Sequence, residues 1–178
     1  MAIAIIRNIG GGSGVQPLSE INLLEYQNGE PVTISPRKWY GQQVDSQNCA
    51  ANINTSRYYF YGEYYSHDDH DTGNSYVGAC DFYTPSVDVS RFNSLKLTFT
   101  GTHQVSGTYT TDACVLYVAL DGVETKYISP ATDLVIDISN KSTLNFHIHQ
   151  ENSSYKQWCN ENCQITQAFL STVPKGQA

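Results

Sequence analysis

Residues 95–100 alternate strictly between apolar and polar side chains, and this pattern restricts the possible folds more than any other feature of the chain. Leu95, Leu97 and Phe99 are apolar, and the residue that follows each of them is polar. Side chains of a β-strand point alternately to its two faces. The pattern therefore predicts a strand with one face on a core and the other toward solvent. We expect Gly101 to end this strand.

Similar patterns recur along most of the chain after residue 30. Residues 115–120 are apolar on both faces, Asp121-Gly122 is typical of a two-residue turn, and residues 123–128 complete a hairpin. Further strands are expected at residues 58–65, 76–83, 134–138, 144–148 and 164–170. About eight to ten short strands without a long helical segment predict an all-β fold, an antiparallel jelly-roll-like β-sandwich over residues 31–178.

Residues 1–30 differ from the rest of the chain. A short β-prone run, Ile3 to Ile6, leads into a glycine-rich hinge at residues 10–14. Ser19 is placed to cap one helical turn over residues 20–26. A strand, a hinge and a linker predict an extended N-terminal arm that anchors the sandwich to a neighbouring subunit, and a frayed terminus is the alternative.

Charge and hydropathy restrict the partners. Charged residues make up 15% of the chain, below the usual quarter, and the net charge is −7. Nucleic-acid phosphates would repel such a chain, and no basic stripe compensates, so we expect no nucleic-acid partner. The apolar run at the N-terminus is too short for a signal peptide, and no segment reaches the roughly 20 apolar residues of a membrane span. We therefore expect a protein made in the cytoplasm, without membrane contact.

Five cysteines occur, at positions 49, 80, 114, 159 and 163. An odd number in a chain without an export signal favours reduced thiols. Cys114 lies in the apolar run from Ala113 to Leu120, so we expect it to be a small core residue. Cys159 and Cys163 are spaced for a zinc site or a local disulfide, but no second close pair is present to complete a zinc site.

The densest group of chemically active side chains lies between Arg57 and Asp71. On a strand, one face would carry Tyr59, Tyr61, Glu63 and Tyr65, and the other Tyr58, Phe60 and Tyr64. Phe60 has no polar group, so its face should pack on the core. Three interpretations of the tyrosine–glutamate face stay open: a protein interface, plain packing, or stacking on sugar rings. Asp69 and Asp71 follow in the next turn and complete our set of candidate partner-binding residues.

Two short motifs contain residue types that bind metals. Asp69-x-Asp71 before Gly73 is part of a calcium-loop pattern, but Gly73 stands where a third ligand is needed. His147-x-His149 with Glu151 is similar to the first motif of the cupins, although the glycine and the second motif of that family are missing. We expect no metal at either motif: the first is read as a hydrated turn, the second as two histidines on the polar face of an exposed strand.

Catalysis has no support among the motifs. The chain contains no Gly-x-Ser-x-Gly elbow, no phosphate loop and no His-Glu-x-x-His sequence. Carboxylate pairs such as Glu63 with Asp68 would cleave a glycosidic bond only in a suitable geometry, which a sequence does not reveal. We therefore expect a non-enzymatic protein with no catalytic residue and no cofactor.

Two segments look like parts of the jelly-roll modules of bacteriophage tail, baseplate and head-fibre proteins. The first is residues 87–101, where Val-Asp-Val-Ser-Arg-Phe-Asn-Ser leads into the alternating strand, and the second is the closing segment 165–171. They also resemble galactose-binding-like carbohydrate modules. The first resemblance implies a structural protein of a phage particle, in its capsid, neck or tail. Such a protein would contact other virion proteins, form a homo-oligomer and be assembled into the virion in the host cytoplasm. The second implies a carbohydrate-binding module that recognises host-surface glycans through residues 58–83.

Overall fold

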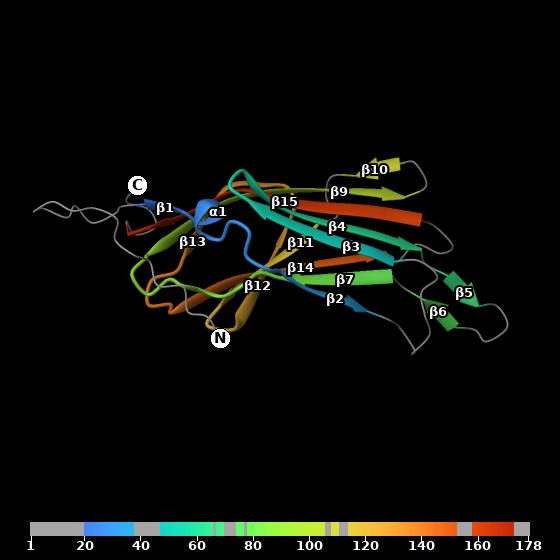
Figure 1. The fold of residues 1–178 in the computed structure, drawn as a ribbon, viewed down its shortest axis with the longest axis horizontal. Coiled ribbons are helices and arrows are strands. Elements are labelled where there is room, and N and C mark those ends of the chain that lie inside the picture. Colours follow the sequence, from blue (N-terminus) through green and yellow to red (C-terminus); the bar gives the residue numbers. More distant parts are fainter. Residues whose placement is uncertain are drawn as a thin grey trace, which may run out of the picture.

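The fold is given by a computed structural model, which describes residues 20–37, 47–65, 67–69, 74–76, 78–105, 108–110, 114–152 and 158–172. Within these ranges the chain is nearly all β, with one short helix. Two antiparallel sheets pack face to face, so the predicted all-β sandwich is confirmed (Figure 1).

Sheet A has seven strands. Five follow the order β10-β9-β15-β4-β3, while β1 pairs with β15 and β13 pairs with β9. Their bounds are β1 Glu20–Asn22, β3 Gln47–Asn54, β4 Arg57–Tyr65, β9 Ser94–Val105, β10 Thr108–Thr110, β13 Ala131–Asp137 and β15 Trp158–Ser171. Strand β15 is central, because it pairs with β9 on one side and with β4 and then β1 on the other.

Sheet B has six strands, with β8 pairing with β14 and the others in the order β12-β11-β14-β7-β2. Their bounds are β2 Thr33–Arg37, β7 Gly78–Tyr83, β8 Val87–Asp88, β11 Val115–Leu120, β12 Val123–Ile128 and β14 Thr143–Asn152. Strands β5 (His67–Asp69) and β6 (Asn74–Tyr76) pair with each other at the end of the sandwich opposite β1 (right and left in Figure 1). The expected strand 76–83 is thus divided between β6 and β7.

The core lies between the sheets and is built by the alternation along their strands. Leu97 and Phe99 of β9 are fully buried, as their spacing predicts. From β4, Phe60 meets Phe82 of sheet B with ring centroids 5.5 Å apart. Burying a side chain of this size contributes about 1.5–3 kcal/mol, so these facing apolar rows supply much of the stability of the sandwich.

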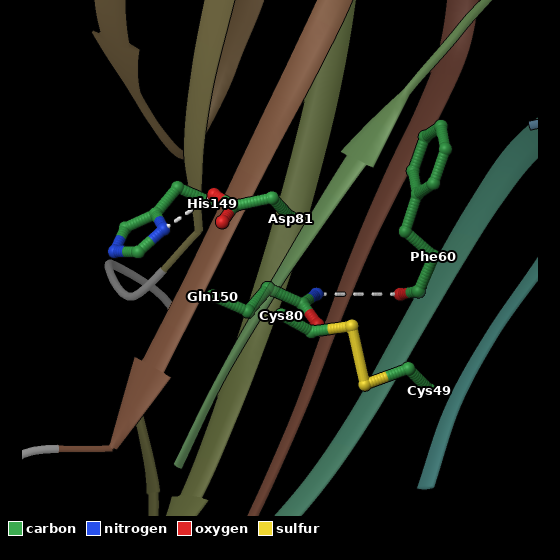
Figure 2. The surroundings of a disulfide bond; sticks show 6 residues. All are labelled: Cys49, Phe60, Cys80, Asp81, His149 and Gln150. Atoms are coloured by element: carbon green, nitrogen blue, oxygen red, sulfur yellow. Dashed lines mark hydrogen bonds and ion pairs between the residues drawn. A yellow bond between two sulfur atoms is a disulfide. The ribbon is translucent and has the colours of Figure 1, made fainter. Parts of the chain in front are cut away.

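Two disulfides join the sheets, and the prediction of reduced thiols is wrong. Cys49 of β3 pairs with Cys80 of β7, with Cα atoms 6.6 Å apart (Figure 2). Cys114, just before β11, pairs with Cys163 of β15, with Cα atoms 5.7 Å apart. Cys163 is therefore in neither a local disulfide nor a zinc site with Cys159. The partners are 31 and 49 residues apart in sequence, so sheet packing rather than sequence proximity brings them together.

Gly101 lies within β9 and does not end it, contrary to expectation. It is opposite Cys163 in the pairing of β9 with β15, with its face toward the core. A Cβ atom at this position would overlap Cβ of Cys114 and come within 3.1 Å of Oγ of Ser129. Glycine is present because the Cys114–Cys163 disulfide takes the space of a side chain, and the strand continues past it.

The segment just before residue 30 packs on the sandwich. Residues 20–22 form β1 on the edge of β15, and helix α1, Leu23–Tyr26, follows directly. Asn22, rather than Ser19, caps this helix, since its Oδ1 accepts a hydrogen bond from N–H of Leu24 at 3.1 Å. Leu23 and Leu24 are buried in the main core, so the sandwich includes residues 20–30. Residues 1–19, with the predicted strand and glycine hinge, lie outside the described residues.

A buried tyrosine fastens this segment to the core. The hydroxyl of Tyr58 donates to the carbonyl of Leu23, with the two oxygens 2.6 Å apart, and lies 2.9 Å from Oε1 of Gln27. Burial raises the pKa of Tyr58 well above its ordinary value. The face of β4 that carries Tyr58 and Phe60 was predicted to pack on the core, and this is confirmed by their complete burial.

The predicted hairpin at residues 115–128 is confirmed. Strands β11 and β12 pair from Leu120 with Val123 to Val115 with Ile128. Asp121 and Gly122 both have positive φ, at 51° and 79°, as a type I′ turn requires. The hairpin places β12 at one edge of sheet B.

Candidate functional site

The tyrosines of β4 divide between the two faces of sheet A. Tyr58 and Phe60 point inward, whereas Tyr59, Tyr61 and Glu63 belong to the outer face and are half-buried. Opposite them in β15 stand three amides in the same order: Gln164 faces Tyr59, Asn162 faces Tyr61 and Asn160 faces Glu63. The outer face of sheet A therefore presents two tyrosine rings and a carboxylate beside a row of amides.

The next strand extends this polar row. Residues of β9 that pair with the β15 amides carry hydroxyls and one more amide, and β3 adds another amide beside Tyr59. We call the whole surface the amide face; it comprises Asn52, Tyr59, Tyr61, Glu63, Thr98, Thr100, Thr102, Gln104, Asn160, Asn162, Gln164 and Gln167. Apart from Glu63, every side chain of this set is uncharged.

Hydrogen bonds within β4 and across to β15 orient the side chains of the amide face. The hydroxyl of Tyr61 lies 3.4 Å from both Oε2 of Glu63 and Oδ1 of Asn160. Partial burial, and then the charge of Glu63, raise the pKa of Tyr61, so its phenol keeps its proton.

Arg57 borders the amide face beside Tyr59. Its guanidinium carbon lies 4.8 Å from the ring centroid of Tyr59, and its Nη1 donates to Oε1 of Gln164 at 3.0 Å. A cation over a tyrosine ring and a hydrogen bond to an amide hold both side chains in one arrangement. The ring of Tyr59 is thus held in position at the edge of the face.

The other predicted contact residues do not all join this surface. Tyr65 is the last residue of β4 and pairs in register with Trp158 of β15. Asp69 is in β5, where it pairs with Asn74, so it belongs to the small separate sheet and not to sheet A. Asp71 lies outside the described residues. The structure therefore unites Tyr59, Tyr61 and Glu63, and it separates Asp69 from them.

A second polar group occupies the outer face of sheet B. His147 of β14 is buried, with 6% of its surface exposed. Its Nδ1 lies 2.9 Å from Oε1 of Glu124, and its Nε2 lies 2.9 Å from Oδ1 of Asp81. The rings of Tyr83 and Tyr117 stack on it, with centroids 4.4 and 5.0 Å away. Strand β14 lies between β7 and β11, so the prediction of an exposed histidine strand is wrong.

The surroundings of His147 suit a structural role better than chemistry. Both ring nitrogens are occupied and both ring faces are covered, which leaves no approach for a substrate. His149 adds a contact from its Nδ1 to Oδ1 of Asp81 at 2.8 Å (Figure 2). Within the described ranges, no three histidine, cysteine, aspartate or glutamate side chains are arranged to hold a metal ion.

A further histidine–carboxylate pair lies at the inner side of sheet A. His103 and Glu161 are opposite each other on β9 and β15, and Nδ1 of His103 contacts Oε1 of Glu161. Glu161 is almost completely buried, so this contact offsets part of the cost of placing a carboxylate between the sheets. The sequence did not predict this pair, because Gly101 indicated the end of the strand before His103.

The amide face is the candidate site, since it is a broad polar surface with half-buried aromatic rings, whereas the polar group on sheet B is centred on a buried histidine. It presents neutral hydrogen-bonding groups, two aromatic rings and the carboxylate of Glu63. No helix in the part of the chain that the structure describes has the length and hydrophobicity to cross a membrane. No protein-family model matches this chain, and no curated protein is significantly similar to it.

Proposed function

We propose that this chain is a non-enzymatic binding module and that the amide face of sheet A is its contact surface. The observation that carries the proposal is the composition of that face, in which two tyrosine rings stand among neutral amides and hydroxyls. Desolvating neutral polar groups costs less than desolvating charges, so such a surface can be covered by a partner. Tyrosine adds a large rigid contact area at a small cost in conformational entropy.

The hydrogen bonds within the face support the proposal. Arg57 holds Gln164, and Asn162 donates to Thr102 across the neighbouring strand. Side chains that are ordered before binding lose less entropy when a partner arrives. A β-sheet is also a rigid base, which keeps the tyrosines of β4 at a fixed spacing.

We infer that the partner is another protein of a phage particle. The similarity of residues 87–101 and 165–171 to virion jelly-roll modules supports this class of partner. In this role the sandwich is a structural component of the capsid, neck or tail. Residues 1–19 would supply the second attachment, as an arm that adds to a neighbouring sheet.

A glycan is the second candidate, and one feature favours it. The hydroxyl of Tyr61 lies beside the carboxylate of Glu63 and the amide of Asn160. An aromatic ring beside such groups can stack on a sugar ring while the polar atoms bond its hydroxyls. The glycan would then be bound at Tyr61 rather than across the whole face.

The test is a Tyr59→Ala/Tyr61→Ala double variant, with Thr33→Ala on the exposed part of sheet B as the matched control. Incorporation is measured in particles assembled with the variant as their only source of this protein. We expect at least tenfold less incorporation for the double variant and no change for Thr33→Ala. Thermal unfolding of both variants should show that each is folded. Wild-type incorporation by a folded double variant would reject the amide face as the virion contact.

A glycan array tests the second candidate, glycan binding, separately from the protein contact. Binding that is present in wild type and lost in Tyr61→Ala would favour the glycan. An array without signal for the wild-type chain would reject it and leave the protein contact as the proposed function.

A further inference from the structure

Strand β12 is an exposed edge of sheet B. It pairs with β11 on one side, and no strand among the described residues pairs with its other side. Five of its six residues are exposed, including Val123 at 68% and Ile128 at 55%. An edge strand carries unpaired N–H and C=O groups that can pair with another strand. The edge of β12 therefore offers a strand-pairing surface separate from the amide face.

The backbone groups at this edge can be assigned from the hairpin. Asp121 donates its N–H to the carbonyl of Thr143 in β14 at 3.1 Å, so its neighbour Leu120 points its backbone groups toward β12. Val123, which pairs with Leu120 across the two-residue turn, points back at β11. Alternation then directs the backbone groups of Glu124, Lys126 and Ile128 to the free edge.

This assignment leaves few ways for two copies of β12 to pair. Two identical antiparallel strands related by a twofold axis must place edge-facing residues opposite edge-facing residues. An axis at Glu124 would set Glu124 against its own copy, and an axis at Lys126 would set Lys126 against its own copy. Like charges directly opposite each other destabilise a strand pair. An axis at Thr125 instead places Glu124 of each copy opposite Lys126 of the other, which gives two pairs of opposite charge.

The same register also matches the other side chains. With the axis at Thr125, this threonine meets its own copy, and exposed Val123 meets the half-buried Tyr127 of the second copy. Threonine pairs and aromatic–β-branched pairs are favourable neighbours across antiparallel strands. The Glu124–Lys126 pairs would lie on the outer face of sheet B, because Lys126 stands opposite Tyr117, on the same face as His147.

We propose that β12 pairs with β12 of a second copy of this chain, antiparallel and with the twofold axis at Thr125. Sheet B then continues from one molecule into the next. This goes beyond the proposed function, since it uses a different sheet and a different edge, and it leaves both amide faces open. A dimer of this kind would present two contact surfaces and raise the avidity for an array of partners.

Charge exchange tests the register. Lys126→Glu would set two carboxylates against each other at both charged pairs of the dimer, and Glu124→Lys would set two ammonium groups against each other there. Each variant alone should therefore dimerise at least tenfold more weakly than wild type. A mixture of the two variants restores an opposite charge at every pair. Sedimentation equilibrium over a range of concentrations should show dimers for wild type and for the mixture, and monomers for each variant alone.

Lys126→Arg is the matched control and should dimerise like wild type. Far-ultraviolet circular dichroism confirms folding, which matters for Glu124→Lys because Glu124 also bonds His147. If that variant does not fold, the comparison of Lys126→Glu with Lys126→Arg decides the question. A wild-type chain that stays monomeric at every concentration, or a Lys126→Glu chain that dimerises as well as wild type, would overturn the proposal.

Discussion

At the scale of single residues, the packing of the two sheets explains why position 101 is a glycine. Its missing side chain makes room for Cys114, which joins sheet B to Cys163 of sheet A. In sequence the same glycine looks like the end of a strand, because glycine is unfavourable inside one. The difference arises from a contact with a residue of the other sheet, and no local pattern encodes that contact.

Gly101→Ala should destabilise the protein by about 1–3 kcal/mol, the usual cost of overpacking a core. The added methyl group would meet Cys114 and backbone of β15, neither of which can move freely. Urea denaturation of the oxidised protein measures the change in the free energy of unfolding. Thr100→Ala, one residue earlier and exposed, is the control and should change it little. Equal stability of Gly101→Ala and wild type would show that the disulfide does not occupy this space.

At the scale of single elements, the turn of the β11–β12 hairpin is tied to the turn before β14. Oδ1 of Asp121 accepts hydrogen bonds from the backbone N–H groups of Ser142, at 2.9 Å, and Thr143, at 3.0 Å. These bonds hold the pKa of Asp121 below its ordinary value. A carboxyl whose pKa is lower in the folded protein stabilises it above the unfolded pKa, and this contribution is lost as pH falls through the folded pKa.

Asp121→Asn should therefore lower stability at pH 7, and its difference from wild type should shrink as pH falls and wild-type Asp121 takes up a proton. Asparagine tolerates the positive φ of this position, so the change isolates the charge. Denaturant titrations of both proteins at neutral pH and at about pH 2.5 measure the difference. A difference that stays the same at both pH values would contradict the role of the carboxylate.

The elements themselves were largely predictable from sequence. Two-residue periodicity located β4, β9 and β14, and Asp121-Gly122 located the hairpin, because these signals are local. A helical turn over residues 20–26 was predicted and contains α1, but the packing of β1 and α1 on the sandwich was not predictable, since both elements are too short to show periodicity. Their place depends on Leu23, Leu24 and Tyr58, which meet only in the folded core.

The candidate site was partly predictable for the same reason. Strand periodicity placed Tyr59, Tyr61 and Glu63 on one face, and the structure has them there. The amides that complete the face come from β15, about 100 residues later, as the contact of Tyr61 with Asn160 illustrates. Strand order decides that neighbour, and the order of strands in a sandwich follows from the packing of the entire chain.

At the scale of the whole molecule, the disulfides connect the two sheets at separate places. Closing loops of these lengths lowers the entropy of the unfolded chain, and each disulfide is expected to add about 2–4 kcal/mol to stability. Dithiothreitol should therefore lower the melting temperature of the wild-type protein. Alkylation before and after reduction, read by mass spectrometry, should show four cysteines that react only after reduction. Four cysteines that react without reductant would contradict both pairings.

The position of β15 has a consequence for how the protein is made. It is the last described strand to leave the ribosome, yet β9, β4 and β1 all pair with it. Every strand of sheet B has been synthesised by residue 152, whereas sheet A lacks its centre until residue 171. Until β15 is made, the edges of β9 and β4 that pair with it have no partner, although β9 can already pair with β13 and β4 with β3. A nascent chain stalled before β15 therefore leaves the strand edges at the centre of sheet A unpaired, which exposes it to aggregation and chaperone capture.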